Sequence, residues 1–461
     1  MAIDGLRADH VGVLGYDRAT TPTLDRLARE GVAFRQAFAA APLARPSHLA
    51  LITGCDPFVS QRFLSNELKG RRWNVPAAVP RLAVEFLAAG YETAAFLDGD
   101  ELRIEAGIER GFQRFVVLRE DAGSEPTQEQ VARVLSWLRM RTRESWFAYV
   151  HLADLERCWR RPRRDWERYF EARAELDHVP PVGSTDEVFF ALPFSRWRGG
   201  SRTLGEYEAS YDGHLVKLDK ELDALFAGIR RLGLEESTTI VVLGTHGTQF
   251  GEAGLILESG CYSTADLNVP WILRPRPGVL PRPGEVRREV VSLLDLAPTL
   301  LALEGLAVPR GMHGRSLAGL IDGTAATLDR RFVLASCGVQ QGCAVLGEQH
   351  CLEYLAPGQL ASGFLRRAWF GEPHDDDQEE GAETVVRFYD RIAEPYPSLV
   401  PRSEPRAEEF HAYREAAARW IGNMQDARLV LQGGLHLGEE VPDARVRELI
   451  ELGYLGEGVA R

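Results

Sequence analysis

Short apolar runs alternate with amphipathic helical patterns through most of this chain, and this alternation restricts the fold more than any other feature. Strand-like runs occupy residues 32–34, 92–97, 146–151 and 238–243, and helical patterns occupy residues 80–89, 128–141, 206–232 and 291–305. Strands that alternate with helices of this length are typical of βα units with parallel pairing. We therefore predict an α/β fold, in which a mostly parallel, doubly wound sheet is flanked by helices.

The character of the chain changes after about Asp322. Residues 331–355 contain short apolar runs with little helical pattern between them, which predicts a small antiparallel sheet. A length of 461 residues corresponds to two or three domains. We expect an α/β core over residues 1–325 and a smaller C-terminal domain of short strands and helices over residues 326–461.

The composition excludes several classes of protein. The formal charge is 54 − 67 = −13, which argues against a nucleic-acid-binding protein. The six cysteines are scattered without a C-x-x-C pair, so neither a disulfide framework nor a cysteine zinc site is expected. No apolar run approaches the roughly 20 residues that cross a bilayer, so no transmembrane segment is predicted. The sequence makes no prediction of the oligomeric state.

The first residues raise a question about the start of the chain. They lack the basic and apolar regions of a signal peptide, so the sequence as written predicts a cytoplasmic protein. Asp4 has the position of a residue at the carboxyl end of a first strand, yet only three residues precede it. A central strand has about five or six residues. We therefore expect either a truncated strand or a start that is placed too late.

Several motifs occur in a fixed order along the chain. They include Asp4-Gly5-Leu6-Arg7, Pro46-Ser47-His48, Tyr211-Asp212-Gly213, His246-Gly247 and Asp295-Leu296-Ala297-Pro298-Thr299. Each motif is short, but the ordered set resembles the sulfatase family of the alkaline phosphatase superfamily. The resemblance implies the fold predicted above, a divalent cation, calcium or magnesium, and hydrolysis of sulfate or phosphate esters.

The position that carries the nucleophile in the family is altered. Ester hydrolysis needs a nucleophile, a cation on the non-bridging oxygens and an acid for the leaving group. The family places Cys, Ser or Thr two residues before the Pro-Ser pair, and in sulfatases the Cys or Ser becomes formylglycine. This chain has Ala44 there, so no formylglycine can form. Ser47 offers a nearby hydroxyl as a substitute, although the family uses that serine in a supporting role.

The metal site implied by the resemblance is also incomplete. The family uses an aspartate at the end of the first strand and an Asp-His or Asp-Asn pair after a late strand. Asp4 and His246 match these positions, but Thr245 stands where the second aspartate is expected. A hard cation binds through several oxygens, usually including more than one carboxylate. The loss of this carboxylate predicts that the cation binds weakly or not at all.

Other candidate residues have both functional and structural interpretations. His151 matches a catalytic strand end of the family, but Glu156 replaces the histidine expected near it and is expected to repel an anionic ester. His48 and His151 are equally consistent with buried structural histidines. Asp4 in turn is consistent with a residue that only accepts backbone N–H bonds. Arg45, beside Ala44, and Arg7 in the first motif are candidates to bind an anion.

Two functional hypotheses remain. In the first, the chain is a sulfatase-like protein that has lost catalysis and binds an anionic ester, a glycan or a partner protein. In the second, it is an active metal-dependent hydrolase of sulfate or phosphate esters that uses Ser47, His151 or His246 in a non-standard way. Ala44 and Thr245 favour the first hypothesis, because the departures lie at catalytic positions while the scaffold motifs are kept.

Overall fold

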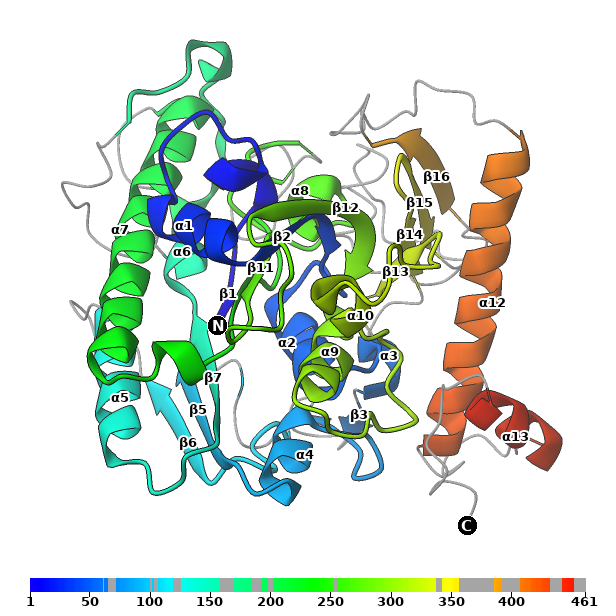
Figure 1. Ribbon diagram of the computed structural model, residues 1–461. Helices are drawn as coiled ribbons and strands as arrows, with labels where there is room; N and C mark the ends of the chain where they lie inside the picture. Colours follow the sequence, from blue (N-terminus) through cyan, green and yellow to red (C-terminus); the bar gives the residue numbers. More distant parts are fainter. Residues whose placement is uncertain are drawn as a thin grey trace.

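An eight-stranded sheet forms the centre of the protein in its computed structural model (Figure 1). The structure describes residues 1–60, 62–64, 72–99, 102, 107–118, 126–157, 170–183, 192–197, 202–252, 255–336, 342–355, 385–391, 407–431 and 442–451. The strand order is β12-β2-β11-β10-β1-β7-β5-β6. The strands are β1 (Ala2–Ile3), β2 (Val32–Phe38), β5 (Glu92–Asp98), β6 (Arg114–Leu118), β7 (Trp146–Leu152), β10 (Ile240–Gly244), β11 (Trp271–Arg274) and β12 (Glu285–Ser292).

The pairing confirms a mostly parallel sheet. Only β11 runs against its neighbours, β10 and β2, and every other pair is parallel. Successive residues of β5 enter different cores: Ala94 and Phe96 belong to one, Ala95 and Leu97 to the other. A strand buried on both faces needs the nearly continuous apolar sequence that predicted it.

Helices cover both faces of this sheet, as predicted. One core includes residues of α1 (Pro22–Glu30), α5 (Pro126–Met140) and α7 (Leu204–Arg231). The other includes residues of α2 (Ala44–Thr53), α9 (Leu296–Leu303) and α10 (Ala318–Asp322), and α4 (Leu82–Ala88) packs with α9. Shorter elements are α3 (Pro57–Ser60), α6 (Asp154–Arg157), α8 (Thr264–Leu267), β3 (Arg62–Leu64), β4 (Arg72–Asn74), β8 (Val182–Gly183) and β9 (Leu192–Pro193).

The prediction of a helix over residues 291–305 is wrong at its N-terminal end. β12 continues to Ser292, and α9 begins only at Leu296. A capping box separates the two elements: the Asp295 carboxylate accepts a hydrogen bond from the Ser292 amide at 2.9 Å, and the Ser292 hydroxyl accepts one from the Leu294 amide at 3.3 Å. The apolar run crosses this boundary without a change, so hydrophobic pattern alone did not reveal it.

A second, four-stranded sheet confirms the predicted antiparallel structure near the C-terminus. It consists of β13 (Val333–Ser336), β14 (Gly342–Leu346), β15 (His350–Leu355) and β16 (Val385–Asp390). Helix α12 (Ala407–Leu431) packs on it through Tyr413 and Trp420, and α13 (Asp443–Glu451) follows. The domain boundary at residue 325 stays a prediction. Among the described helices, none combines the length and the apolar character needed to cross a membrane.

Strand β1 is short but paired on both sides. Ala2 lies opposite Leu243 of β10 and His151 of β7, and Ile3 lies opposite Gly244 and Leu152. Two residues are thus enough to hold Asp4 at the carboxyl edge of the sheet, between the ends of β7 and β10.

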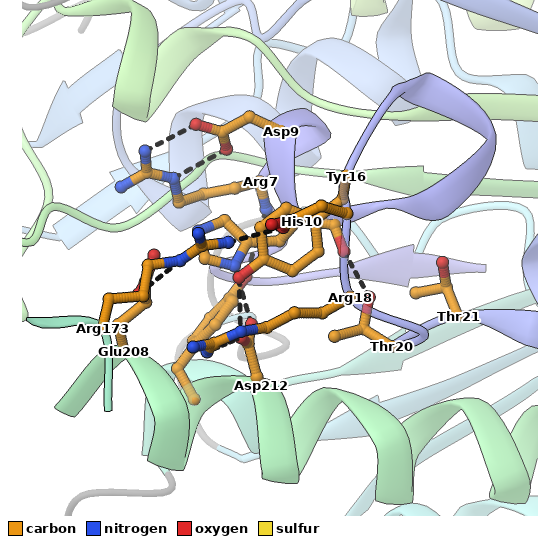
Figure 2. A network of polar contacts seen from close by, with 12 residues as sticks. Arg7, Asp9, His10, Tyr16, Arg18, Thr20, Thr21, Arg173, Glu208 and Asp212 are labelled. Atoms are coloured by element: carbon orange, nitrogen blue, oxygen red, sulfur yellow. Dashed lines mark hydrogen bonds and ion pairs between the residues drawn. The ribbon is translucent and has the colours of Figure 1, made fainter. Parts of the chain in front are cut away.

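Helix α7 is joined to the N-terminal segment by a buried polar network around Asp212. Figure 2 shows His10, Tyr16 and Arg18 converging on this carboxylate, at 2.8, 2.6 and 2.8 Å. Two turns further along α7, Asp219 accepts hydrogen bonds from the Thr23 and Leu24 amides at the start of α1. The sequence motif around Tyr211 and Asp212 therefore serves the scaffold.

Candidate functional site

The candidate site lies where β1, β7 and β10 end, which is where open α/β sheets commonly place their chemistry. Gly5, directly after Asp4, has φ +72°, a conformation that side chains other than glycine rarely adopt. A Cβ on Gly244 would lie 2.5 Å from the Leu6 carbonyl oxygen. Glycine at this position therefore allows the chain after β1 and the end of β10 to approach closely, which brings Asp4 and Thr245 together.

Asp4 is the centre of the site and is fully buried. Its Oδ1 accepts hydrogen bonds from His48 Nε2 at 2.9 Å and from the Thr245 hydroxyl at 2.5 Å. Its Oδ2 accepts a hydrogen bond from His151 Nε2 at 2.7 Å. The structure thus brings together four of the residues that the sequence singled out, from four separate segments.

The electrostatics favour an ionised Asp4 beside a neutral His48. Burial alone would raise the pKa of Asp4, but His151 and His48 outweigh it and hold the pKa well below its usual value. Burial lowers the pKa of His48 to about 4. Tyr149 contacts His48 Nδ1 through its hydroxyl at 2.6 Å, and burial raises the pKa of this tyrosine, so the hydroxyl keeps its proton and donates.

His246 follows Thr245 directly after β10 and is 1% exposed. Its Nδ1 contacts the Gly247 carbonyl oxygen at 2.7 Å, and its Nε2 lies 4.0 Å from Oε2 of Glu156. Burial lowers the pKa of His246, but the carboxylates of Glu156 and Asp4 outweigh this effect, and the net shift is upwards. Glu156 therefore faces the cluster from α6.

The start of α2 supplies the altered nucleophile position. Ala44 is the first residue of the helix and is 7% exposed. Ser47 is fully buried, and its hydroxyl donates a hydrogen bond to the Ala41 carbonyl oxygen at 2.8 Å. This contact engages the Ser47 hydroxyl within the protein, and the supporting role that the resemblance implies for Ser47 stays a prediction. Arg45 is half-buried.

Arg7 is already engaged by acidic groups. Its guanidinium contacts Glu252 at 2.5 Å and Asp9 at 2.7 Å, and it donates to the Thr248 carbonyl oxygen at 3.0 Å. Two carboxylates balance one guanidinium, so Arg7 adds no net positive charge near the site.

Two residues of the site, Tyr149 and Glu156, were not predicted from the sequence to contribute to it. Tyr149 lies two positions before His151 in β7, and the period of two along a strand places both side chains on the same face, so this residue could have been found. Glu156 was expected to repel a ligand. Its proximity to His246 depends on the short helix α6, whose position is fixed by a hydrogen bond of 2.8 Å from Arg196 Nη1 to the Glu156 carbonyl oxygen.

Two sets of side chains have the composition and proximity to hold a metal ion. Asp4, His48 and His151 form the first, and Asp4, Glu156 and His246 form the second. Within each set the ligand atoms lie within 4.8 Å of one another. Asp4 is common to both, so the site has the potential ligands for a divalent cation.

The fold and this arrangement agree with a comparison to protein families. The model of the sulfatase family matches residues 2–306. The chain belongs to the sulfatase family. Its structural neighbours lie in the alkaline phosphatase superfamily, and members of the family generally use a divalent metal.

Individual relatives are distant. An ulvan-active sulfatase of Formosa agariphila is 25% identical in an alignment 357 positions long, which covers 71% of this chain and 65% of the relative. A putative sulfatase from Bacteroides thetaiotaomicron superposes with a TM-score of 0.68 and 18% identity, over 96% of this chain and 95% of the other. Another protein, solved in complex with its substrate D-glucosamine-2-N,6-O-disulfate, superposes with a TM-score of 0.63 and 16% identity, over 93% of this chain and 95% of the other.

Proposed function

We propose that this chain is a sulfatase-family protein that has lost formylglycine-dependent hydrolysis of sulfate esters and binds an anionic glycan or ester. One observation carries the proposal: α2 begins with Ala44, and its methyl group stands at the position that the resemblance assigns to the nucleophile of the family. A methyl group neither attacks sulfur or phosphorus nor becomes an aldehyde. Ser47, the nearest hydroxyl in the motif, is buried against Ala41.

The ligand class is supported by the relatives and restricted by the charge of the site. One relative is named as ulvan-active, and one structural neighbour was solved with a sulfated glucosamine. We propose a sulfated glycan for this chain as well. Asp4 and Glu156 would repel a bare sulfate group, so an ion bound between the protein and the anion is required. The resemblance implies a calcium or magnesium ion at this place, and weak binding of those two ions is part of the proposal.

The second candidate function is an active metal-dependent hydrolase with a non-standard mechanism. His246 favours it, because a buried imidazole nitrogen without a hydrogen-bond partner among the described residues is a plausible base or ligand. His151 is less suited, since its Nε2 is engaged by Asp4.

Hydrolysis assays distinguish the two functions. Purified protein is incubated with generic aryl sulfates and aryl phosphates in the presence of Ca²⁺, Mg²⁺ or Mn²⁺. We expect no release of sulfate or phosphate above the rate without protein, and we expect measurable binding of sulfated but not unsulfated disaccharides. Metal-dependent turnover that disappears in Asp4→Ala would overturn the proposal and establish the second function.

A further inference from the structure

Glu156 brings a second carboxylate to the Asp4 cluster, in which the resemblance to the family implies an aspartate at the position of Thr245. Thr245 brings a neutral hydroxyl to Asp4 in place of a second charge. Glu156 approaches the same cluster from α6, with its Oε2 at 4.0 Å from His246 Nε2. One ligand atom from each of Asp4, Glu156 and His246 lies within 4.8 Å of the other two.

The contact of His246 with the Gly247 carbonyl oxygen selects the tautomer of the neutral imidazole that can bind a cation. The Gly247 carbonyl oxygen can only accept, so Nδ1 at 2.7 Å carries the proton. The lone pair is then on Nε2, which is buried and has no hydrogen-bond partner among the described residues. A buried acceptor without a donor is costly, and a hydrogen bond from the second nitrogen to a carbonyl is the usual support of a histidine that binds metal.

Asp4 keeps one position open for the same ion. An ionised carboxylate has about four lone-pair sites. His48 and Thr245 use two on Oδ1, and His151 uses one on Oδ2. His48 donates from Nε2 because Tyr149 donates to its Nδ1. These donors hold Asp4 in place and leave a lone pair on Oδ2.

We propose that Asp4, Glu156 and His246 bind a first-row transition-metal dication, with Glu156 replacing the carboxylate lost at Thr245. His48, His151 and Thr245 are positioning residues that orient Asp4. The inference identifies the cation on which the proposed anion binding rests. Metal binding is measured without any ester, so this inference and the proposed function fail separately.

The ligand set distinguishes this ion from calcium. Ca²⁺ takes six to eight oxygen ligands, whereas imidazole together with carboxylates suits Zn²⁺ and its neighbours in the first row. Zinc is tetrahedral with ligands roughly 2.0–2.2 Å from the ion, so two ligand atoms on one ion are about 3.5 Å apart. His246 Nε2 and Glu156 Oε2 lie 4.0 Å apart, slightly more than this spacing, so the two side chains would move a little closer together on binding an ion.

The test is calorimetric titration of protein freed of metal by a chelator, with Zn²⁺, Mn²⁺, Ca²⁺ and Mg²⁺ each added alone. We expect one ion per chain and at least about tenfold tighter binding of Zn²⁺ or Mn²⁺ than of Ca²⁺. In Glu156→Gln the affinity for Zn²⁺ is expected to fall by about 10- to 100-fold. Tighter binding of Ca²⁺ than of both transition metals overturns the proposal.

Control variants separate a lost ligand from a damaged fold. Glu221→Gln makes the same substitution at a glutamate of similar exposure, 19% against 24%, which pairs with Lys217 on α7. It should bind Zn²⁺ like the unaltered protein, and both variants should melt at the same temperature in chelator. A titration with Co²⁺ adds a spectroscopic readout, because its visible absorption changes with the ligands. Loss of Zn²⁺ binding in His48→Gln, with normal binding in Glu156→Gln, would assign the ion to Asp4, His48 and His151 and overturn the role of Glu156.

Discussion

Asp4 and Asp212 are both fully buried carboxylates with three side-chain donors, yet they are neutralised differently. Asp212 receives His10 at 2.8 Å, Tyr16 at 2.6 Å and Arg18 at 2.8 Å (Figure 2). Asp4 receives two histidines and one threonine, at 2.7, 2.9 and 2.5 Å. The guanidinium of Arg18 is charged at all physiological pH values, whereas none of the Asp4 donors carries a permanent charge.

This difference separates a structural carboxylate from one that is available to a cation. A buried negative charge is costly unless an opposite charge compensates it. Arg18 supplies that charge to Asp212, which therefore serves to fix α7 against the N-terminal segment. Asp4 has hydrogen bonds but no fixed positive partner among the described residues. A protonated histidine or a bound metal ion fills this role.

Replacing Asp212 should have the largest effect on stability. Asp212→Ala leaves Arg18 and His10, whose side chains are 15% and 3% exposed, without their shared acceptor. Removing one partner of a buried ion pair costs about 3–5 kcal/mol, and we expect a loss of this size in the free energy of unfolding. Urea denaturation measures it.

The same variant tests whether the two carboxylates are independent. Asp212→Ala should leave the affinity for Zn²⁺ unchanged, because Asp212 does not contact the Asp4 cluster. Asp212→Asn, which keeps the shape but not the charge, should fall between the two proteins in stability. If Asp212→Ala loses less than about 1 kcal/mol in the free energy of unfolding, the ion pair of Asp212 with Arg18 contributes no more to stability than an exposed pair does.

Acid should destabilise the metal-free protein through His48. Its pKa is lowered from 6.5 to about 4 in the folded state, so the unfolded chain takes up the proton first as the pH falls. The contribution is complete above pH 6.5 and is lost progressively towards pH 4, by about 3 kcal/mol in all, since one pKa unit corresponds to about 1.4 kcal/mol. Denaturation at several pH values in chelator measures this slope.

The control for this pH dependence is His48→Gln, which cannot take up the proton. Its free energy of unfolding should change less over the same range than that of the unaltered protein. Equal slopes in the two proteins would mean that the pKa of His48 is not lowered in the folded state, so that this imidazole can become the positive partner of Asp4 as the pH falls.

The fold was largely predictable because the spacing of apolar residues along the chain reflects which side chains are buried. The runs at residues 92–97 and 146–151 became β5 and β7, and the pattern at residues 206–232 became α7, within two residues at each end. The error at residues 291–305 has a different cause. Ser292 and Asp295 end one element and start the next through local hydrogen bonds, and the hydrophobic pattern does not reveal these.

The candidate site was predictable in its members but not in its contacts. The resemblance selected Asp4, His48, His151 and Thr245, and the structure places all four in contact. Sequence could not show that Glu156 faces His246, because this depends on the direction of a four-residue helix held by Arg196. The proposed preference for a transition metal rests on that contact, so it could not be predicted from the sequence.

The smallest effect, and the most direct test of the charge on Asp4, comes from Thr245→Val. Valine keeps the shape of threonine and removes only the donor to Asp4. A hydrogen bond to a charged group contributes about 1.5–3 kcal/mol, whereas one to a neutral group contributes about 0.5–1.5 kcal/mol. Thr20→Val is the matched control, because this buried hydroxyl donates to the His10 carbonyl oxygen at 2.6 Å. We expect losses of about 2 kcal/mol at Thr245 and about 1 kcal/mol at Thr20 in urea denaturation of chelated protein. If the two losses are equal, Asp4 is neutral in the folded state, and the contrast with Asp212 disappears.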